Sequence, residues 1–215
     1  MNQKLTDGRA LLRVIKASAA CNQLSLVLPV DSPVRAYLRP IATAEGQLDE
    51  TDLVLLSDWR NKYVKSFLTE FHANPARTAE WLTKFVHQND GKILFMLEDL
   101  KGGRLGHIGL AFIDWDNSYG EADAIVSGGN SPPGLMKIAL QASLRWAREQ
   151  LGLKKLGVRV RSDNSALEFY KKVGFCEIKR VPLGFTQDGD DITWFEDESL
   201  GSDVPSLVYM IYEGK

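Results

Sequence analysis

Apolar and polar residues follow patterns that divide most of the chain into strands and helices. Alternating apolar residues predict strands at 34–38, 92–98, 104–113, 121–126, 156–160, 176–181 and 206–212. Apolar residues at helical spacing predict helices at 48–59, 76–87, 135–151 and 165–173. Ser165 and Glu168 fit a capping box at the start of the last helix. The strand, loop, helix and strand over 121–160 form a βαβ unit, so its two strands should be parallel, after an antiparallel meander.

Two segments lie outside this pattern. Residues 1–33 form an N-terminal extension of unknown role, in which a short helix precedes a strand at 24–28. Near the other end, residues 183–206 hold seven acidic residues and no basic one, with an expected hairpin turn at 188–189. We therefore expect a single domain over 34–215 that carries this acidic stretch as an insertion.

Composition excludes several classes of function. The 215 residues include 44% hydrophobic and 25% charged residues, which is typical of a soluble globular protein. The net charge of -2 and the pI near 6.0 argue against a dedicated nucleic-acid binder. No apolar run approaches the roughly 18 residues of a membrane span, and a signal-peptide pattern is missing. Cys21 and Cys176 lack metal-ligand spacing, so we expect a cytoplasmic protein without a metal.

A turn-rich loop precedes the helix at 135–151. It reads Ser-Gly-Gly-Asn-Ser-Pro-Pro-Gly over 127–134. A helix N-terminus offers unpaired N–H groups and the positive end of the helix dipole, which together suit a pyrophosphate. The loop lacks both the Gly-Lys-Ser/Thr of a Walker loop and a complete Gly-x-Gly-x-x-Gly pattern. A phosphate site is therefore one interpretation, and an ordinary turn is the other.

A more specific motif follows the strand at 156–160. The run Asn-x-Ala-x-x-x-Tyr-x-x-x-Gly-Phe begins at Asn164. It resembles the last signature segment of the GNAT superfamily of N-acetyltransferases, which usually has one more residue between Asn and Ala. The residues that match in register are Ala166, Tyr170, Gly174 and Phe175. The resemblance covers roughly 34–181 and the last strand.

The resemblance implies an α/β GNAT fold whose mixed sheet is splayed between its central strands, with helices on both faces. It also implies direct transfer of an acetyl group from acetyl-CoA to an amine in a ternary complex. The runs Leu38-Arg39-Pro40 and Trp59-Arg60-Asn61 are similar to the subgroup of ribosomal-protein and amino-sugar acetyltransferases. We therefore expect a small-molecule amine acceptor, with an amino sugar or its nucleotide form as a candidate. The alternatives are a protein N-terminal or side-chain amine, and a non-catalytic acyl-CoA-binding module; a homodimer is also considered.

The same resemblance assigns the acetyl-CoA contacts. The pantetheine arm would bond to the backbone of the strand at 121–126, the pyrophosphate would lie at the start of the helix at 135–151, and two lysines would meet the 3′-phosphate. The residues assigned to acetyl-CoA are Ala124, Ile125, Val126, Gly134, Leu135, Met136, Asn164, Lys171 and Lys172. The loop departs from the usual Gln/Arg-x-x-Gly-x-Gly/Ala, because Ser131 and Met136 hold its first and last positions.

Acyl transfer to an amine needs a base and an acid. An amine with a pKa of about 10 must lose a proton before it attacks, and the departing thiolate needs a proton. The resemblance implies that Tyr170 is the general acid. The base is not fixed by the motif: Asp123 and Glu121 point the same way from one strand, with Asp123 nearer its middle, and His107 is a further alternative.

The acceptor pocket is expected at the end of the helix at 48–59. Trp59, Arg60 and Asn61 lie where the GNAT fold usually builds it, and Arg60 could hold a phosphate or carboxylate. The acidic stretch at 183–206 could cover the pocket, with Trp194 as a wall and its acids favouring a cationic amine. A surface ion pair for Arg60 and a solvated insertion for the acidic stretch are the alternatives.

Overall fold

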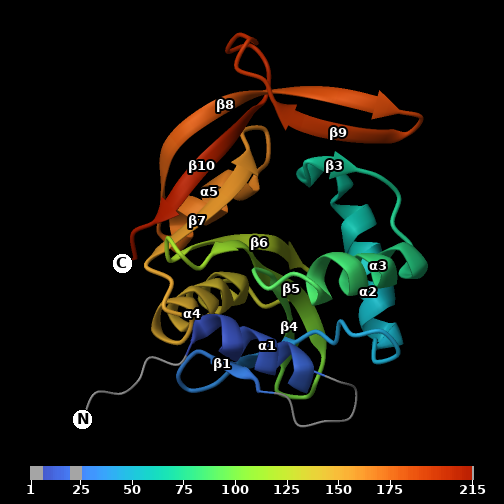
Figure 1. Cartoon of the computed structure of the whole chain (residues 1–215), viewed down its shortest axis with the longest axis vertical. Helices are drawn as coiled ribbons and strands as arrows, with labels where there is room; N and C mark the ends of the chain where they lie inside the picture. The colour runs from blue at the N-terminus through green and yellow to red at the C-terminus, as the bar shows by residue number, and fades with distance from the viewer. Residues whose placement is uncertain (1–6, 20–25, 215) are drawn as a thin grey trace.

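The fold is built on one mixed sheet. The computed structural model describes residues 7–19 and 26–214, and within them ten strands lie in the order β1-β2-β4-β5-β6-β7-β10-β8-β9-β3 (Figure 1). The strands are β1 (Leu28–Val30), β2 (Ala36–Pro40), β3 (Thr69–Glu70), β4 (Ile93–Asp99), β5 (Arg104–Asp114), β6 (Tyr119–Ser127), β7 (Lys155–Arg161), β8 (Phe175–Asp188), β9 (Asp191–Glu196) and β10 (Ser206–Tyr212). The helices are α1 (Gly8–Ser18), α2 (Glu50–Lys62), the short η1 (Val64–Ser66), α3 (Pro75–Trp81) with its π-helical continuation η2 (Leu82–His87), α4 (Leu135–Glu149) and α5 (Ala166–Val173). None of these described helices has the length and apolar character that crossing a membrane requires.

Helices cover both faces of the sheet, as expected. Side chains of a strand point alternately to the two faces, so alternate residues of β4 enter two different cores. Ile93 and Phe95 pack into the core formed with α1, α4 and α5. Leu94 and Met96 pack into a second core with α2 and η2. The predicted mixed α/β architecture is confirmed, since β6 and β7 pair in parallel between antiparallel neighbours.

The segment that precedes the predicted domain contributes to the first core. Leu12 and Ile15 of α1 are buried there. Strand β1 pairs antiparallel with β2, so that Val30 lies opposite Ala36. Of the strand predicted at 24–28, residues 24–25 lie outside the described residues and residues 26–27 are not in a strand; β1 begins at the last predicted position.

The parallel strands β6 and β7 separate half-way along their length. Their pairing runs from Tyr119 opposite Lys155 to Ala122 opposite Val158, although both strands continue further. On its other side β6 shifts register against β5 just beyond this point, and Ala124 has a φ of 48°. One extra residue on one strand of a pair is a β-bulge, which bends the strand. The splayed sheet is thereby confirmed.

The acidic stretch near the C-terminus joins the sheet as a hairpin. Strand β8 continues far beyond the predicted 176–181, and Phe185 lies opposite Trp194 of β9. The turn at Gly189 is where the sequence predicts it. Because β9 also pairs with β3, the hairpin reaches over to the connection between α2 and α3 (Figure 1).

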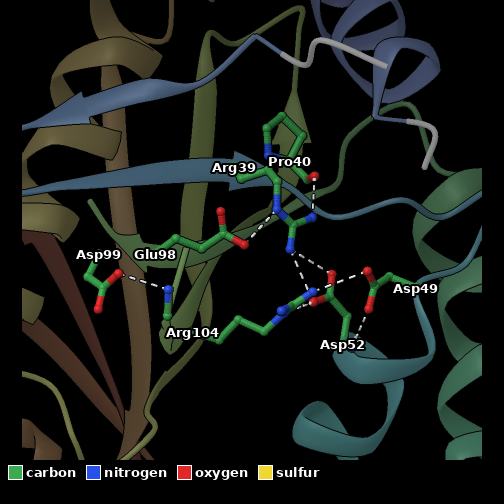
Figure 2. A network of polar contacts seen from close by, with 8 residues as sticks. Arg39, Pro40, Asp49, Asp52, Glu98, Asp99 and Arg104 are labelled. Atoms are coloured by element: carbon green, nitrogen blue, oxygen red, sulfur yellow. Dashed lines mark hydrogen bonds and ion pairs between the residues drawn. The ribbon is translucent and has the colours of Figure 1, made fainter. Parts of the chain in front are cut away.

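A buried carboxylate holds the start of α2 against the sheet. Asp52 accepts hydrogen bonds from Arg39 of β2 at 2.9 Å and from Arg104 of β5 at 2.6 Å (Figure 2). Glu98 of β4 accepts from the same Arg39 at 2.8 Å, and Asp49 accepts from Arg104 at 3.1 Å. Asp49 also caps α2, because its carboxylate accepts the N–H of Asp52. The first turn of α2 is thus bonded to two strands, β2 and β5, and Glu98 of β4 joins the same network through Arg39.

We expect Asp52→Asn to lower the free energy of unfolding by about 3 kcal/mol. The change removes the negative charge that Arg39 and Arg104 share in a nearly solvent-free position, which typically costs about 3–5 kcal/mol. Urea unfolding measures the loss. Asp58→Asn, on an exposed position of the same helix, is the control and should stay within about 0.5 kcal/mol of the unchanged protein. Equal effects of the two changes would contradict the role of Asp52.

Candidate active site

A cavity of about 460 Å³ lies between the end of β6 and the N-terminus of α4. Four of the residues assigned to acetyl-CoA border it: Ile125, Gly134, Met136 and Lys172. Ser127 and Phe169 border it as well, although the sequence did not single them out. Their only sequence signal is that each is the direct neighbour of a predicted site residue. Residues predicted to contact acetyl-CoA thus line this cavity from β6, from the start of α4 with its preceding loop, and from α5.

The N-terminus of α4 is open toward an anion. Gly134 precedes the helix with a φ of 80°, and no side chain caps the first turn. The N–H of Leu135 bonds to the carbonyl of Pro132. The following amides of the first turn have no side-chain acceptor. The first turn contains no acidic residue. Apart from Gly134 and its two chain neighbours, no atom of the described residues lies within 4 Å of the point where a Cβ on Gly134 would be. These are the properties of a helix end that binds phosphate.

Ser131 supplies a hydrogen-bonding group without a partner in this cavity. Its Oγ is buried, and no described residue bonds to it. An unsatisfied buried hydroxyl costs about 1–3 kcal/mol, so an oxygen of a ligand at this position would remove that cost. Ser131 stands where the usual loop pattern has Gln or Arg. The residues present therefore fit the pyrophosphate of acetyl-CoA with a hydroxyl in place of a long side chain.

The charge of Asp123 acts on residues from several elements. It forms an ion pair with Lys92 at 3.0 Å, and about a third of its side chain is exposed. Burial is the largest influence on the pKa values of Tyr170, His107 and Arg60, and the charge of Asp123 raises the pKa of all three. These residues come from α5, β5 and α2. One partly exposed carboxylate thus has two predicted site residues around it, together with the histidine that the sequence kept as an alternative base.

Tyr170 and His107 are both neutral at physiological pH. Burial raises the pKa of Tyr170, whose ring packs against Phe169 and Phe175 at centroid distances of 5.4 and 5.9 Å. Burial lowers the pKa of His107 to about 4, and its ring stacks on Trp59. The His107 Nδ1 is buried and has no partner in the described residues. Tyr170 is therefore a proton donor at neutral pH, whereas His107 is an uncharged imidazole.

Glu121 lies in a different environment from Asp123. Its two carboxylate oxygens accept hydrogen bonds from Tyr119 at 2.8 Å and from Arg159 at 2.6 Å. The side chain is buried, and it lies opposite Gly157 where β6 and β7 are still paired. Each of the two carboxylates on this strand is paired with one cation, but only Asp123 is partly exposed to solvent.

The three residues at the end of α2 have separate roles. Trp59 is buried in the second core, where its ring leaves no space for a Cβ on Gly128. The Asn61 amide donates to the carbonyl of Ala73 at 2.9 Å and accepts its N–H at 2.7 Å. Asn61 therefore closes the connection between α2 and α3. Arg60, in contrast, donates to Thr69 and lies over the rings of Phe67 and Phe71.

Trp194 lies on β9 beside the α2–α3 connection. Its indole N–H donates to Glu70 of β3 at 2.8 Å, and the guanidinium of Arg161 lies 4.0 Å above its ring. Arg161 also donates to the same Glu70 carboxylate at 2.9 Å. The hairpin, β3 and the end of β7 are thus held together by one polar cluster around the predicted wall of the acceptor pocket.

Helix α5 begins with an asparagine cap and not with the predicted capping box. Ser165 has helical dihedral angles and makes no side-chain cap. The Asn164 Oδ1 instead accepts the N–H of Ala166 at 2.8 Å, because asparagine satisfies a helix end as readily as serine does. The Nδ2 of Asn164 donates to the carbonyl of Ser66 at 3.2 Å. The motif asparagine therefore joins α5 to the segment that follows α2.

Residues 35–176 match the model of the acetyltransferase (GNAT) domain. The chain belongs to the GNAT family. As a member of that family it is an acetyl-CoA-dependent N-acetyltransferase, and acetyl-CoA is its acetyl donor. No curated protein sequence matches the GNAT chain. The described residues contain no group of three or more His, Cys, Asp or Glu side chains placed to hold a metal ion.

Solved structures share the fold of this GNAT protein. Spermidine N-acetyltransferase from Vibrio cholerae, in complex with CoA and spermine, aligns with a TM-score of 0.63 at 19% identity over 82% of this chain and 94% of that one. A dodecameric structure of spermidine N-acetyltransferase from the same organism aligns with a TM-score of 0.59 at 18% identity, over 82% and 92% of the two chains. At these identities the likeness concerns the fold.

We expect Lys172→Gln to weaken acetyl-CoA binding about 3–10-fold, because Lys172 borders the cavity and its charge attracts a phosphate. Lys171→Gln is the matched control. Lys171 forms an ion pair with Glu168 at 2.7 Å, so its removal should change the dissociation constant less than about twofold. Calorimetric titration at low salt measures both. A larger effect of Lys171→Gln would place the phosphate on the other side of α5.

Stability should fall between pH 6.5 and pH 4 because His107 is buried. Its pKa is about 4 in the folded chain against 6.5 in the unfolded chain, so over this range the unfolded chain binds a proton that the folded chain excludes. The loss amounts to about 3 kcal/mol at pH 4. Urea unfolding at pH 7 and pH 4 should show this loss, and His107→Gln should remove most of it. The exposed His72→Gln is the control and should keep the original pH dependence.

Proposed function

We propose that the protein acetylates the primary amine of a small molecule, with Asp123 as general base and Tyr170 as general acid. The observation that carries the proposal is the convergence of Asp123 and the buried Tyr170 where β6 leaves β7, beside a cavity suited to CoA. Proton acceptor and proton donor are then both at the place where the thioester would meet the amine.

Acetyl-CoA supplies the reactive thioester carbonyl. The amides at the start of α4, the hydroxyl of Ser131 and the ammonium of Lys172 would hold its pyrophosphate and phosphate groups. Beyond Ala122 the backbone of β6 no longer pairs with β7, so the carbonyl and amide groups around Ile125 are available to the pantetheine arm. These roles agree with the assignments made from the sequence.

The protonation states support the two catalytic roles. Tyr170 keeps its proton at neutral pH, because burial and the charge of Asp123 raise its pKa, and it can give that proton to the thiolate. Asp123 is a partly exposed carboxylate and can take a proton from the amine directly or through water. Glu121 is the weaker candidate, since both of its oxygens already accept hydrogen bonds. His107 is uncharged but fully enclosed.

A small molecule is the proposed acceptor. The Vibrio cholerae structure of the same fold is named a spermidine N-acetyltransferase and holds spermine, so this fold accommodates small amines. The hairpin that carries Trp194 lies against β3 and would limit the acceptor space. An amino sugar or its nucleotide form, a cytoplasmic location and a homodimer stay predictions from the sequence. A protein N-terminus is the alternative acceptor.

Calorimetry and a thiol-release assay test the proposal. Acetyl-CoA should bind in the micromolar range, which corresponds to about -8 kcal/mol. Free CoA should then be released in the presence of a panel of amines that includes amino sugars, polyamines, amino acids and short peptides. Preference for single small molecules over peptides supports the proposal. Absence of acetyl-CoA binding at millimolar concentration, or release with peptides alone, contradicts it.

We expect Tyr170→Phe to lower kcat by about 100-fold or more, because the change removes the proton donor to the thiolate. The dissociation constant of acetyl-CoA, measured by calorimetry, should stay within about twofold. Tyr37→Phe on β2, far along the sheet from Asp123, is the matched control and should keep full activity. Unchanged kcat in the Tyr170→Phe variant would leave Tyr170 with a packing role alone.

A further inference from the structure

Arg60 is a cation without a counter-ion beside the proposed base. Its guanidinium lies between two aromatic rings, 3.8 Å from the centroid of Phe67 and 4.4 Å from that of Phe71. One nitrogen, Nη2, donates to the carbonyl and the hydroxyl of Thr69. The Nε is buried and has no partner in the described residues. No carboxylate in the described part of the chain lies within ion-pair distance of this guanidinium.

Most other partly buried arginines of this protein do not share that arrangement. Four of them donate to at least one carboxylate at 3.0 Å or less; they are Arg39, Arg104, Arg159 and Arg161. Arg148 resembles Arg60 in part, because it donates to the carbonyl of Tyr212 and lies over the Tyr212 ring. Taking a cation out of water is unfavourable unless an anion compensates it. Arg60 lacks this compensation, and unlike Arg148 it has a buried Nε without a partner in the described residues.

A second guanidinium makes this position still more positive. Arg77 lies 3.7 Å from the centroid of Phe71, the same ring that Arg60 contacts. Arg77 pairs with Asp191 at 3.3 Å on the exposed side. Burial, and then the charge of Arg77, lower the pKa of Arg60 to about 10, so Arg60 still carries its charge at neutral pH. Of these two neighbouring cations, only Arg77 is paired with a carboxylate, so one positive charge remains for a further anion to compensate.

The end of α2 that carries Arg60 packs against the strands of the proposed reaction centre, since Trp59 stacks on His107 of β5 at a centroid distance of 5.9 Å and His107 lies opposite Val126 of β6. Asp123 acts on the pKa of Arg60, and Arg60 in turn acts on the pKa of His107. Asp123 itself pairs with Lys92, outside ion-pair distance of Arg60. A ligand that placed an ammonium group at Asp123 could therefore place an anionic group at Arg60.

We propose that Arg60 binds a carboxylate or phosphate of the acceptor, so that the substrate is a small amine that also carries an anionic group. The proposal rests on the proposed acetylation at Asp123 and narrows its substrate class. A guanidinium suits both anions, because its planar fork of N–H groups matches two oxygens at once. The amine named for the Vibrio cholerae structure, spermine, has no such group, so this chain would differ from that protein in its acceptor.

Matched pairs of amines test the proposal. Glucosamine 6-phosphate is compared with glucosamine, and tyrosine with tyramine, in the thiol-release assay. For at least one pair, the anionic member should have a kcat/KM about 10–100-fold higher, which is the typical effect of a charged hydrogen bond. Arg60→Gln should abolish this preference mainly through KM, and Arg60→Lys should restore part of it. Arg148→Gln, near the C-terminal end of α4, removes a guanidinium that likewise bonds to a carbonyl and lies over a ring; it is the matched control and should keep the preference.

A purely structural role of Arg60 makes a different prediction. If Arg60 served to hold Thr69 in place, Arg60→Gln would lower the rates of both members of a pair equally, and Thr69→Val would do the same. That result, or equal rates for anionic and neutral amines in the unchanged protein, would overturn the proposal while acetylation itself stood.

A binding measurement keeps the proposal testable without turnover. Inorganic phosphate is titrated by calorimetry into the unchanged protein saturated with CoA, and into Arg60→Gln in the same state. Phosphate binding that is lost in Arg60→Gln supports an anion site at Arg60 even if no amine in the panel is acetylated. Equal binding, or none in either protein, overturns it. Failure of acetyl-CoA to bind would instead be a failure of the proposed function.

Discussion

The early end of pairing between β6 and β7 is the constraint on which the site depends. Buried backbone groups need hydrogen-bond partners, so two strands that part inside a sheet leave groups that a ligand can satisfy. The bulge at Ala124 bends β6 away from β7 just after the last shared pair at Ala122. The α4 N-terminus, the start of α5 and the carboxylate of Asp123 all lie around this parting. A regular parallel ladder would leave no place for a thioester there.

The polar groups around Asp52 differ in hydrogen bonding from two polar groups of the proposed site. The Asp52 carboxylate is nearly inaccessible and shared by Arg39 and Arg104, so its bonding capacity is used within the fold (Figure 2). At the site the opposite holds: Ser131 has a buried hydroxyl without a partner, and Arg60 has a buried Nε without one. Groups of this kind are costly in the free protein, and a ligand with complementary charge would satisfy them.

Helix α2 connects these two kinds of polar group. Its first turn is bonded to two strands through Asp49 and Asp52, and its last turn carries Arg60. Asn61 then closes the connection between α2 and α3. That connection contains β3, which pairs with β9 of the hairpin. The acceptor side of the site is therefore positioned by contacts on both sides of it. Loss of the ion-pair network around Asp52 would therefore alter the position of Arg60, which lies about two turns further along the same helix.

Local patterns in the sequence predicted most of the strands and helices, the parallel βαβ unit and the GNAT motif ending in Phe175, but neither β3 nor the continuation of β8 beyond 181. Each of these depends on residues a few positions apart, whose spacing follows the helical or the extended backbone period. The tertiary structure decided which polar groups are buried and which have a hydrogen-bond or ion-pair partner. Glu121 and Asp123 share one face of a strand in the sequence pattern, and each is paired with a cation in the structure. Glu121 is buried and also bonded to Tyr119, whereas Asp123 is partly exposed. The cap of α5, the closure by Asn61 and the missing counter-ion of Arg60 likewise depend on partners brought together by folding. Periodicity cannot specify such partners, because charge compensation and burial arise from contacts between segments far apart in the chain.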